Sequence, residues 1–340
     1  MGLNEKFFKS AAGGITASDN FVPVLYTGNW NGSNTNTVEV GFRPDWIWIK
    51  RRDGADGHHL YDSVRGIGKV IQSNTTGAEN ASNHVNTTST GFTLLTDNVN
   101  QNNNLFIAWC WKAGGAAVLN QEGTRDTQVS ANVDAGFSVF TASTNNTNGF
   151  LTYGTGLSQP PDLVIYKRTN GSGAWSVASP LLLDTQYLVL NDSAAVATLG
   201  QTIHSYSNTT FGIRNSYQTS NGYDLVFYAF HSVAGYQKIG TYTGTAGSFT
   251  VYTTDNGASG GANGFRPRFV MIKRVDAAGG NWVIIDEPRG SGSIRVYPNS
   301  TSAEHSGQGE SFSSTGFSPR PSSTGDTNIS GATYLYLAIA

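Results

Sequence analysis

Gly41-Phe42-Arg43-Pro44-Asp45-Trp46-Ile47-Trp48-Ile49-Lys50-Arg51 is the stretch that decides the fold, because the chain uses it again. It returns as Gly264-Phe265-Arg266-Pro267-Arg268-Phe269-Val270-Met271-Ile272-Lys273-Arg274 and, more faintly, as Pro161-Asp162-Leu163-Val164-Ile165-Tyr166-Lys167-Arg168. The three lysines in these stretches are spaced by about the length of one small domain. A repeat at such a spacing indicates copies of a single folding unit.

Other landmarks recur in the same order along the chain. Asp62-Ser63-Val64-Arg65-Gly66 matches Asp286-Glu287-Pro288-Arg289-Gly290, and Asn74-Thr75-Thr76-Gly77-Ala78-Glu79 matches Asn299-Ser300-Thr301-Ser302-Ala303-Glu304. Both motifs are largely lost in the middle copy. Each copy closes on an apolar run aligned on an alanine, namely Ala108, Ala229 or Ala338. We therefore expect an N-terminal anchor segment (1–20), module 1 (21–115), a linker (116–135), module 2 (136–233) and module 3 (234–340).

The repeated stretches read as β-strands. Each is short, rich in β-branched and aromatic side chains, and bounded by proline or turn residues. The chain holds 41 glycines and only 13% charged residues, a composition that favours turns over long exposed helices. Both faces of the run 46–49 are apolar, so this strand should be central and covered on both sides. The prediction is an all-β protein of three tandem antiparallel β-sandwich modules, with core tryptophans at positions 46, 48, 109, 111, 175 and 282.

The first twenty residues differ from the modules. Leu3 to Ala12 form the only convincing helical candidate, with Asn4 as a cap and Gly13-Gly14 as a stop. We expect a short N-terminal helix or an extended anchor there. Phe7 and Phe8 would dock either on module 1 or on another protein.

Charge and hydropathy exclude several partners. Lys plus Arg number 21 and Asp plus Glu number 23, which is far from the basic balance of a protein that neutralises phosphates. A nucleic-acid partner is therefore not expected. No run approaches the 18 apolar residues of a membrane-spanning helix, so membrane insertion is not expected either. Cys110 is the single cysteine, which excludes an intrachain disulfide, and its apolar run predicts a buried thiol.

The repeated acidic residues are candidates for the carboxylate pair of a hydrolase. A glycosidase needs two carboxylates facing each other across about 5 to 10 Å, and the candidates are Asp62, Glu79, Asp286, Glu287 and Glu304. Their recurrence at equivalent places of two modules favours a scaffold role. We interpret Asp62 with Arg65, and Asp286 with Arg289, as structural turns in which the aspartate caps the turn and the arginine pairs with it.

Two further motifs have chemical readings that the sequence does not favour. Gly257-Ala258-Ser259-Gly260-Gly261 fits the Gly-x-Ser-x-Gly pattern of serine hydrolases, but no helix follows it as that motif requires. The His58-His59 pair after Asp53 and Asp56 lacks zinc-type spacing and a complete calcium loop. We therefore expect no catalytic residue, no metal and no cofactor. The protein is predicted not to be an enzyme.

Ligand binding is the remaining possibility. Sugar sites present an aromatic platform beside polar loop groups. Trp30, in the loop Gly28-Asn29-Trp30-Asn31-Gly32, is the first candidate, and His58, His59 and Tyr61 are further residues expected to be exposed. These four residues are the predicted glycan-binding set.

The assembled motifs resemble a family of repeat-containing virion proteins encoded by marine bacteriophages. The matching residues are Leu3-Asn4-Glu5-Lys6-Phe7-Phe8-Lys9, Tyr26-Thr27-Gly28, the run Phe42 to Lys50, Asp62-Ser63-Val64-Arg65-Gly66 and the run Ala108 to Gly115. The resemblance runs through the whole chain, is sharpest over residues 1–115, and carries no catalytic residues.

The resemblance implies a tail-fibre, tail-associated or other surface protein of the virion, made in the host bacterial cytoplasm. Phe7 and Phe8 would then attach the chain to other virion proteins. The modules would act as spacers, a homo-oligomer is expected, and the loops could bind a host cell-surface glycan. Two alternatives stay open: a capsid or shell decoration protein that binds only virion subunits, and a polysaccharide depolymerase.

Overall fold

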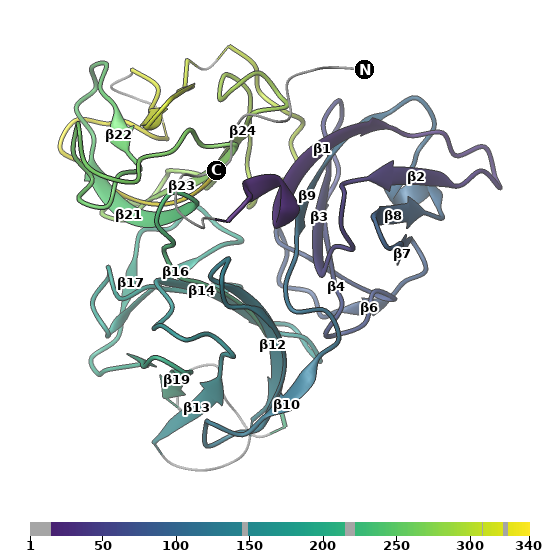
Figure 1. The fold of residues 1–340 in the computed structure, drawn as a ribbon, viewed down its shortest axis with the longest axis horizontal. Coiled ribbons are helices and arrows are strands. Elements are labelled where there is room, and N and C mark those ends of the chain that lie inside the picture. Colours follow the sequence, from purple (N-terminus) through teal and green to yellow (C-terminus); the bar gives the residue numbers. More distant parts are fainter. Residues whose placement is uncertain (1–14, 145–148, 215–221, 308, 322–325) are drawn as a thin grey trace.

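The chain is almost entirely β-structure in antiparallel sheets, arranged as three lobes around a common centre (Figure 1). The computed structural model describes residues 15–144, 149–214, 222–307, 309–321 and 326–340. Its only helical elements are two 3-10 turns, η1 (Ala17–Asp19) and η2 (Asp97–Val99). None of the described segments forms a helix long and apolar enough to cross a membrane. The expected N-terminal helix, with Phe7 and Phe8, lies outside the described residues.

Module 1 consists of one large and one small sheet. The large sheet has the order β1-β9-β3-β4-β5-β6 and the small sheet the order β2-β8-β7. The strands are β1 (Phe21–Thr27), β2 (Asn36–Glu39), β3 (Trp46–Arg51), β4 (His58–Asp62), β5 (Lys69–Gln72), β6 (Asn80–Ala81), β7 (Val85–Thr87), β8 (Gly91–Leu94) and β9 (Leu105–Trp111).

Module 2 repeats this plan with an extension. Its large sheet has the order β10-β11-β12-β20-β14-β15-β16-β17 and its small sheet the order β13-β19-β18. The strands are β10 (Val118–Asn120), β11 (Thr127–Asn132), β12 (Phe137–Ser143), β13 (Phe150–Gly154), β14 (Leu163–Arg168), β15 (Ser176–Ala178), β16 (Gln186–Val189), β17 (Ala197–Thr198), β18 (His204–Tyr206), β19 (Thr210–Arg214) and β20 (Asp224–Phe230).

The segment 116–135, expected to be a linker, belongs to this second sheet. Strand β11 pairs with β12, and β10 pairs with β11, so the segment adds two strands to the edge of the module. The physical reason lies in its alternating pattern: Val129 is buried while Gln128 faces outward, as in a half-buried strand. The module boundary therefore lies near residue 115 rather than at 136.

Module 3 has the same plan in its shortest form. Its large sheet has the order β21-β28-β23-β24-β25 and its small sheet the order β22-β27-β26. The strands are β21 (Gln237–Thr243), β22 (Val251–Tyr252), β23 (Phe269–Arg274), β24 (Val283–Asp286), β25 (Arg295–Val296), β26 (Ser311–Ser313), β27 (Gly316–Ser318) and β28 (Thr333–Ile339).

The register of the closing strands corrects the alignment of the three modules. Lys50 lies opposite Ile107, Lys167 opposite Val226, and Lys273 opposite Leu335. The equivalent of Ala229 and Ala338 is thus Cys110, not Ala108. A shift of two residues keeps every side chain on the same face of a strand, so the sequence pattern alone does not reveal this offset.

Each large sheet separates two hydrophobic cores, which explains why its central strands are apolar on both faces. In module 1, Ile47 and Ile49 point to a core shared with the small sheet, whereas Trp46 and Trp48 point the other way. Modules 2 and 3 have their own sandwich cores of the same kind. The inward faces of all three large sheets meet in one central core. The six tryptophans predicted to fill cores are all buried, and all six lie in this central core: Trp46, Trp48, Trp109, Trp111, Trp175 and Trp282.

The three modules close into a ring around the central core, and they do not extend into a row of spacers (Figure 1). One hydrogen bond, repeated three times, demonstrates the closure. His58 Nε2 lies 3.0 Å from the carbonyl of Tyr297, Trp175 Nε1 donates to that of Gln72 (2.8 Å), and Trp282 Nε1 to that of Val189 (2.8 Å). Module 1 thus contacts module 3, module 2 contacts module 1, and module 3 contacts module 2. We call these contacts the 1–3, 1–2 and 2–3 seams.

Candidate functional site

Three of the four residues expected to bind a glycan from the surface are buried in the structure. His58 and Tyr61 are completely buried, and His59 is 9% exposed. They lie on β4, whose two faces both carry cores. Their aromatic faces are consequently closed to a surface sugar.

His58 instead joins two modules. The indole N–H of Trp48 donates to its Nδ1 (2.8 Å), which leaves the hydrogen on Nε2, facing the carbonyl of Tyr297 across the 1–3 seam. The bond from Trp48 needs the neutral ring, because a protonated Nδ1 cannot accept. Burial lowers the pKa of His58 well below its ordinary value and holds it in that form.

Trp30 is the one residue of the predicted set that remains partly accessible. It is half-buried on the loop after β1. Its backbone N–H donates to the carbonyl of Asn100 (2.9 Å), and it bridges to Gln101. Next to it, the amide of Asn100 donates to Asn29 (2.9 Å). A partly exposed aromatic residue on a fixed backbone, with amide side chains on neighbouring residues, is an arrangement that a sugar site uses.

The two Asp-x-x-Arg-Gly motifs form buried turns, and each also reaches into a neighbouring module. Asp62 accepts from the backbone and the guanidinium of Arg65, and Asp286 does the same with Arg289. Across the 1–2 seam, the hydroxyl of Tyr228 donates to Asp62 (2.8 Å). Across the 1–3 seam, the indole of Trp109 donates to Asp286 (2.9 Å). The carboxylates therefore fasten modules together.

The 2–3 seam has lost both halves of this contact. Ser179 follows β15 at the place of the aspartate, and Leu337 stands at the place of Trp109 and Tyr228. Leu337 has no hydrogen-bond donor in its side chain, so it leaves nothing for a carboxylate to accept. The replacement of the aspartate by Ser179 therefore costs this seam no hydrogen bond. Ser179 satisfies its hydroxyl within its own module, on the carbonyl of Asp162 (2.6 Å).

Three equivalent lysines lie buried at the seams. Lys50 donates to the carbonyl of Thr301 (3.2 Å) in module 3, and Lys167 to that of Thr76 (2.9 Å) in module 1. Lys273 donates to Gly280 in its own module. Burial lowers the pKa of each lysine to about 8, because the charged ammonium loses water there. The lysine of the repeated motif is thus a seam residue rather than a surface cation.

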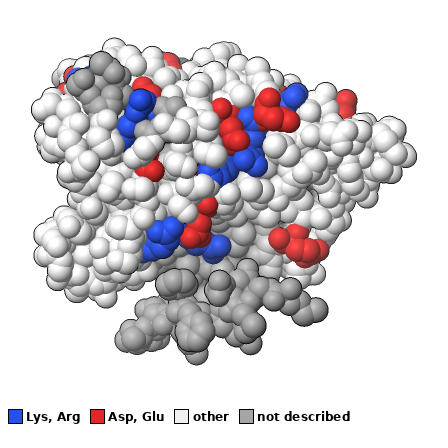
Figure 2. Space-filling view, turned by 90° about the horizontal axis from the view of Figure 1, so that it is seen from above, with Lys and Arg blue, Asp and Glu red and all other residues white. Residues whose placement is uncertain are grey.

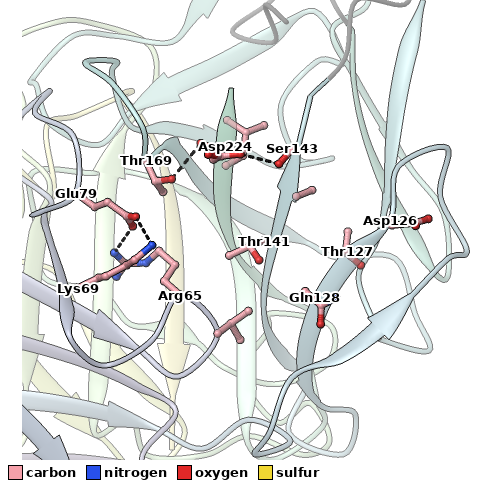
Figure 3. Close-up of a pocket in the computed structure, with 13 residues that line it drawn as sticks. Arg65, Lys69, Glu79, Asp126, Thr127, Gln128, Thr141, Ser143, Thr169 and Asp224 are labelled. Carbon is pink, nitrogen blue, oxygen red and sulfur yellow. Dashed lines mark hydrogen bonds and ion pairs between the residues drawn. The ribbon is translucent and has the colours of Figure 1, made fainter. Parts of the chain in front are cut away.

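A hollow of about 320 Å³ opens at the 1–2 seam. Arg65, Lys69 and Glu79 gather on its module 1 side, and strand β11 of module 2 lies opposite (Figure 3). Glu79 accepts from Lys69 (2.7 Å) and from Arg65 (3.2 Å). The residues that line the hollow are Val64, Arg65, Lys69, Glu79, Asp126, Thr127, Gln128, Thr141, Ala142, Ser143, Thr169, Asp224 and Leu225. Its walls are mostly hydroxyl, amide and carboxylate groups.

The other sequence candidates form no site with one another. Ser259 lies in an exposed run of turns, with no helix after it. Cys110 is buried, and His231 is nearly so. Over the part of the chain that the structure describes, no group of three His, Cys, Asp or Glu side chains has the geometry to hold a metal ion. Asp62 and Asp286 lie in different seams and are fully buried.

The face of the molecule shown in Figure 2 is mostly uncharged. On the face shown in Figure 2, lysine and arginine groups lie directly beside aspartate and glutamate groups. Arg274 with Asp276 and Arg51 with Asp53 are two such exposed pairs, each with a nitrogen to oxygen distance of 2.9 Å. This face therefore offers no extended field of one sign.

Sequence reasoning missed two features of the seams. The first is the middle copy of the asparagine motif, which is Asn191-Asp192-Ser193-Ala194-Ala195-Val196. The second is the pairing of the motif with the lysine strand of the next module. Glu79 N–H donates to Thr169, Glu304 to Arg52 and Val196 to Val275, with distances of 2.8 to 2.9 Å. The shared Asn and Ala of the three motifs were the available signal for the first feature.

Comparison with known proteins places the chain in a family. No curated protein and no solved structure matches it. One family model, described as a domain of unknown function (DUF7483), matches residues 16–340 and so includes all three modules and their seams. The chain belongs to the DUF7483 family.

Proposed function

We propose that the chain is a non-enzymatic surface protein of a phage virion, a tail-fibre or tail-associated adhesin whose loops contact the host cell. The support from the sequence is the family resemblance described above. The support from the structure is the closed ring of three modules around one core. A ring held by repeated seam contacts fixes its outer loops in space, and recognition residues are commonly carried by loops on a rigid scaffold.

In this proposal the modules are not spacers. Their inward faces are used up in the central core, so they act together as one block that displays three sets of loops. We expect the protein to be made in the host bacterial cytoplasm and to lie on the virion surface, assembled with other virion proteins and as a homo-oligomer.

The loop that carries Trp30 is the proposed contact with a host glycan. The backbone N–H of Trp30 is held by the carbonyl of Asn100, and the amides of Asn29 and Asn100 in the same region supply both donors and acceptors for sugar hydroxyls. The test is a host-glycan array probed with the wild-type chain and with Trp30→Ala, using Leu183→Ala as a matched surface control because Leu183 is 63% exposed. Binding that Trp30→Ala removes and Leu183→Ala keeps supports the proposal. Binding equal in all three proteins would refute the role of Trp30.

A capsid or shell decoration protein is the second candidate. The observation in its favour is the edge strand β10, where Val118 and Leu119 are 61% and 56% exposed. Apolar side chains on an open sheet edge suit contact with another protein. Cryo-microscopy of the virion separates the two candidates, since an adhesin lies on the tail and a decoration protein on the shell. A purified virion without this chain would reject both.

A polysaccharide depolymerase is the least supported candidate. Its most plausible acids, Asp62 and Asp286, are buried and engaged by arginine and by ring donors of a neighbouring module. A zymogram on host surface glycans compares wild type with Asp62→Asn and Asp286→Asn. Clearing that both substitutions abolish, in proteins that remain folded, would favour this candidate over the other two.

A further inference from the structure

The 1–3 seam shows how a carboxylate of the asparagine motif is used when its neighbour supplies an arginine. Glu304 of module 3 receives two hydrogen bonds from Arg52 of module 1, at 2.8 Å from Nε and 3.0 Å from Nη2. Both side chains are largely buried, with 20% and 13% exposed. This is the bidentate geometry in which a planar guanidinium matches a carboxylate.

The equivalent place in the 1–2 seam lacks the arginine. Glu79 corresponds to Glu304, and Thr169 corresponds to Arg52, as the shared backbone hydrogen bonds of the two seams establish. Thr169 is too short to reach the carboxylate, and the hollow of about 320 Å³ opens beside it (Figure 3). The hollow therefore includes the space that a guanidinium fills in the neighbouring seam.

Glu79 has two cations in its own module, Arg65 on one carboxylate oxygen and Lys69 on the other. Arg65 corresponds to Arg289, which lies 4.0 Å from Glu304, so Lys69 is the cation that stands in for Arg52, and it fills the space poorly. Lys69 approaches from the solvent side and its side chain is 49% exposed. A lysine provides a point charge rather than a planar fork, so it leaves room beside it for a guanidinium at the same carboxylate.

The far wall of the hollow adds negative charge. Asp126 accepts from the amide of Gln121, and Asp224 accepts from Ser143 (2.6 Å) and Asn170 (3.1 Å). These partners are neutral, and the described residues give neither aspartate an ion pair. The carboxylates on both walls consequently outnumber the two cations, Arg65 and Lys69, one of which is already paired with Asp62.

We propose that the hollow at the 1–2 seam is a binding site for a guanidinium group, presented by an arginine side chain of a protein partner. The ligand would sit where Arg52 sits in the 1–3 seam, with its fork toward Glu79 and its outer edge toward Asp224. The hydroxyl groups of Thr141 and Thr169 complete the polar lining. This site is independent of the Trp30 loop, so it stands or falls separately from the proposed function.

The test is a titration of the whole chain with the peptide Gly-Gly-Arg-Gly-Gly, followed by NMR chemical shifts or calorimetry. The neutral control peptide replaces arginine by citrulline, which has the same shape without the charge. A single-group contact predicts a dissociation constant on the order of 1 mM. Binding of the arginine peptide, at least tenfold tighter than the citrulline peptide, is the expected result. Equal binding of the two peptides would overturn the proposal.

Two substitutions locate the site. Thr169→Arg should fill the hollow from within and abolish peptide binding, whereas Leu183→Arg, at a position 63% exposed and outside the lining of the hollow, should leave binding unchanged. Should Thr169→Arg fail to fold, the exposed pair Asp126→Asn and Asp224→Asn provides a second measurement, with an expected loss of affinity of at least threefold. Retained affinity in the folded variants would overturn the assignment. Agmatine separates the sources, because binding of agmatine without binding of the peptide would reject a protein partner.

Discussion

The contact between Tyr228 and Asp62 allows a direct measurement of how strongly two modules are joined. Asp62 is fully buried and accepts three hydrogen bonds, two from Arg65 and one from the Tyr228 hydroxyl at 2.8 Å. Asp62→Ala removes the nearer of the two carboxylates that pair with the buried Arg65 guanidinium and leaves it only Glu79, at 3.2 Å, so the loss should be at most about 3 to 5 kcal/mol. Tyr228→Phe removes one hydrogen bond to a charged group, which is worth about 1.5 to 3 kcal/mol.

The double variant tells whether the two residues act through each other. With Asp62 absent, the Tyr228 hydroxyl is an unsatisfied buried donor, so the further change to Phe should cost little or even restore stability. We expect the double variant to lose less unfolding free energy than the two single variants lose together, by about 1 to 3 kcal/mol. Urea unfolding followed by tryptophan fluorescence measures it, since the Tyr228 ring stacks on Trp46 with a centroid distance of 4.2 Å.

A matched control comes from the seam that lacks the pair. Ser179→Ala removes only a hydroxyl bonded within module 2 and should cost about 1 kcal/mol or less. Losses for Asp62→Ala and Tyr228→Phe that add within about 0.5 kcal/mol would refute the reasoning, because residues without mutual contact behave additively.

Three further predictions follow from the same seams. Lys50, Lys167 and Lys273 have folded pKa values lowered to about 8, so the unfolded chain holds more protons and the free energy of unfolding should rise as the pH increases from about 8 to about 10.5; Lys50→Met should flatten that rise in urea titrations at several pH values. The pKa of His58 is likewise lowered by burial, so stability should fall as the pH drops below about 6.5, and a His58→Gln variant with an unchanged acid profile would contradict this. Trp48→Ala should cost about 3 to 5 kcal/mol in chemical denaturation, against less than about 0.5 kcal/mol for the exposed Leu183→Ala, and comparable losses for the two would contradict the central core.

The all-β class and the three copies could be predicted from the sequence, and so could the burial of the six tryptophans. Local pattern decides these features: a short run of β-branched and aromatic residues that is apolar on both faces forms a strand with no exposed side. What lies on each face could not be predicted, because the run 46–49 reads the same whether it is covered by one sandwich or by two different cores.

The candidate site shows the same division. The buried turn of Asp62 with Arg65 was predictable, since its parts lie three residues apart. The exposure expected for His58, His59 and Tyr61 was wrong, because a polar residue name does not reveal that a strand runs between two cores. The linker assigned to 116–135 failed for a related reason, since a strand at a sheet edge carries a weak alternating pattern.

The sequence by itself determined how many modules there are and that each is built on apolar central strands. Only the tertiary structure decided that the modules close into a ring, that Asp62 meets Tyr228 while Asp286 meets Trp109, and that Thr169 leaves a hollow where Arg52 fills its counterpart. The physical reason is how far apart in the chain the interacting residues lie. Strand formation and turn capping depend on neighbours a few residues away, whereas the seams join groups that are far apart in the chain, by 93 residues for Trp282 and Val189 and by 252 for Arg52 and Glu304. No local pattern fixes which partner closes such a contact.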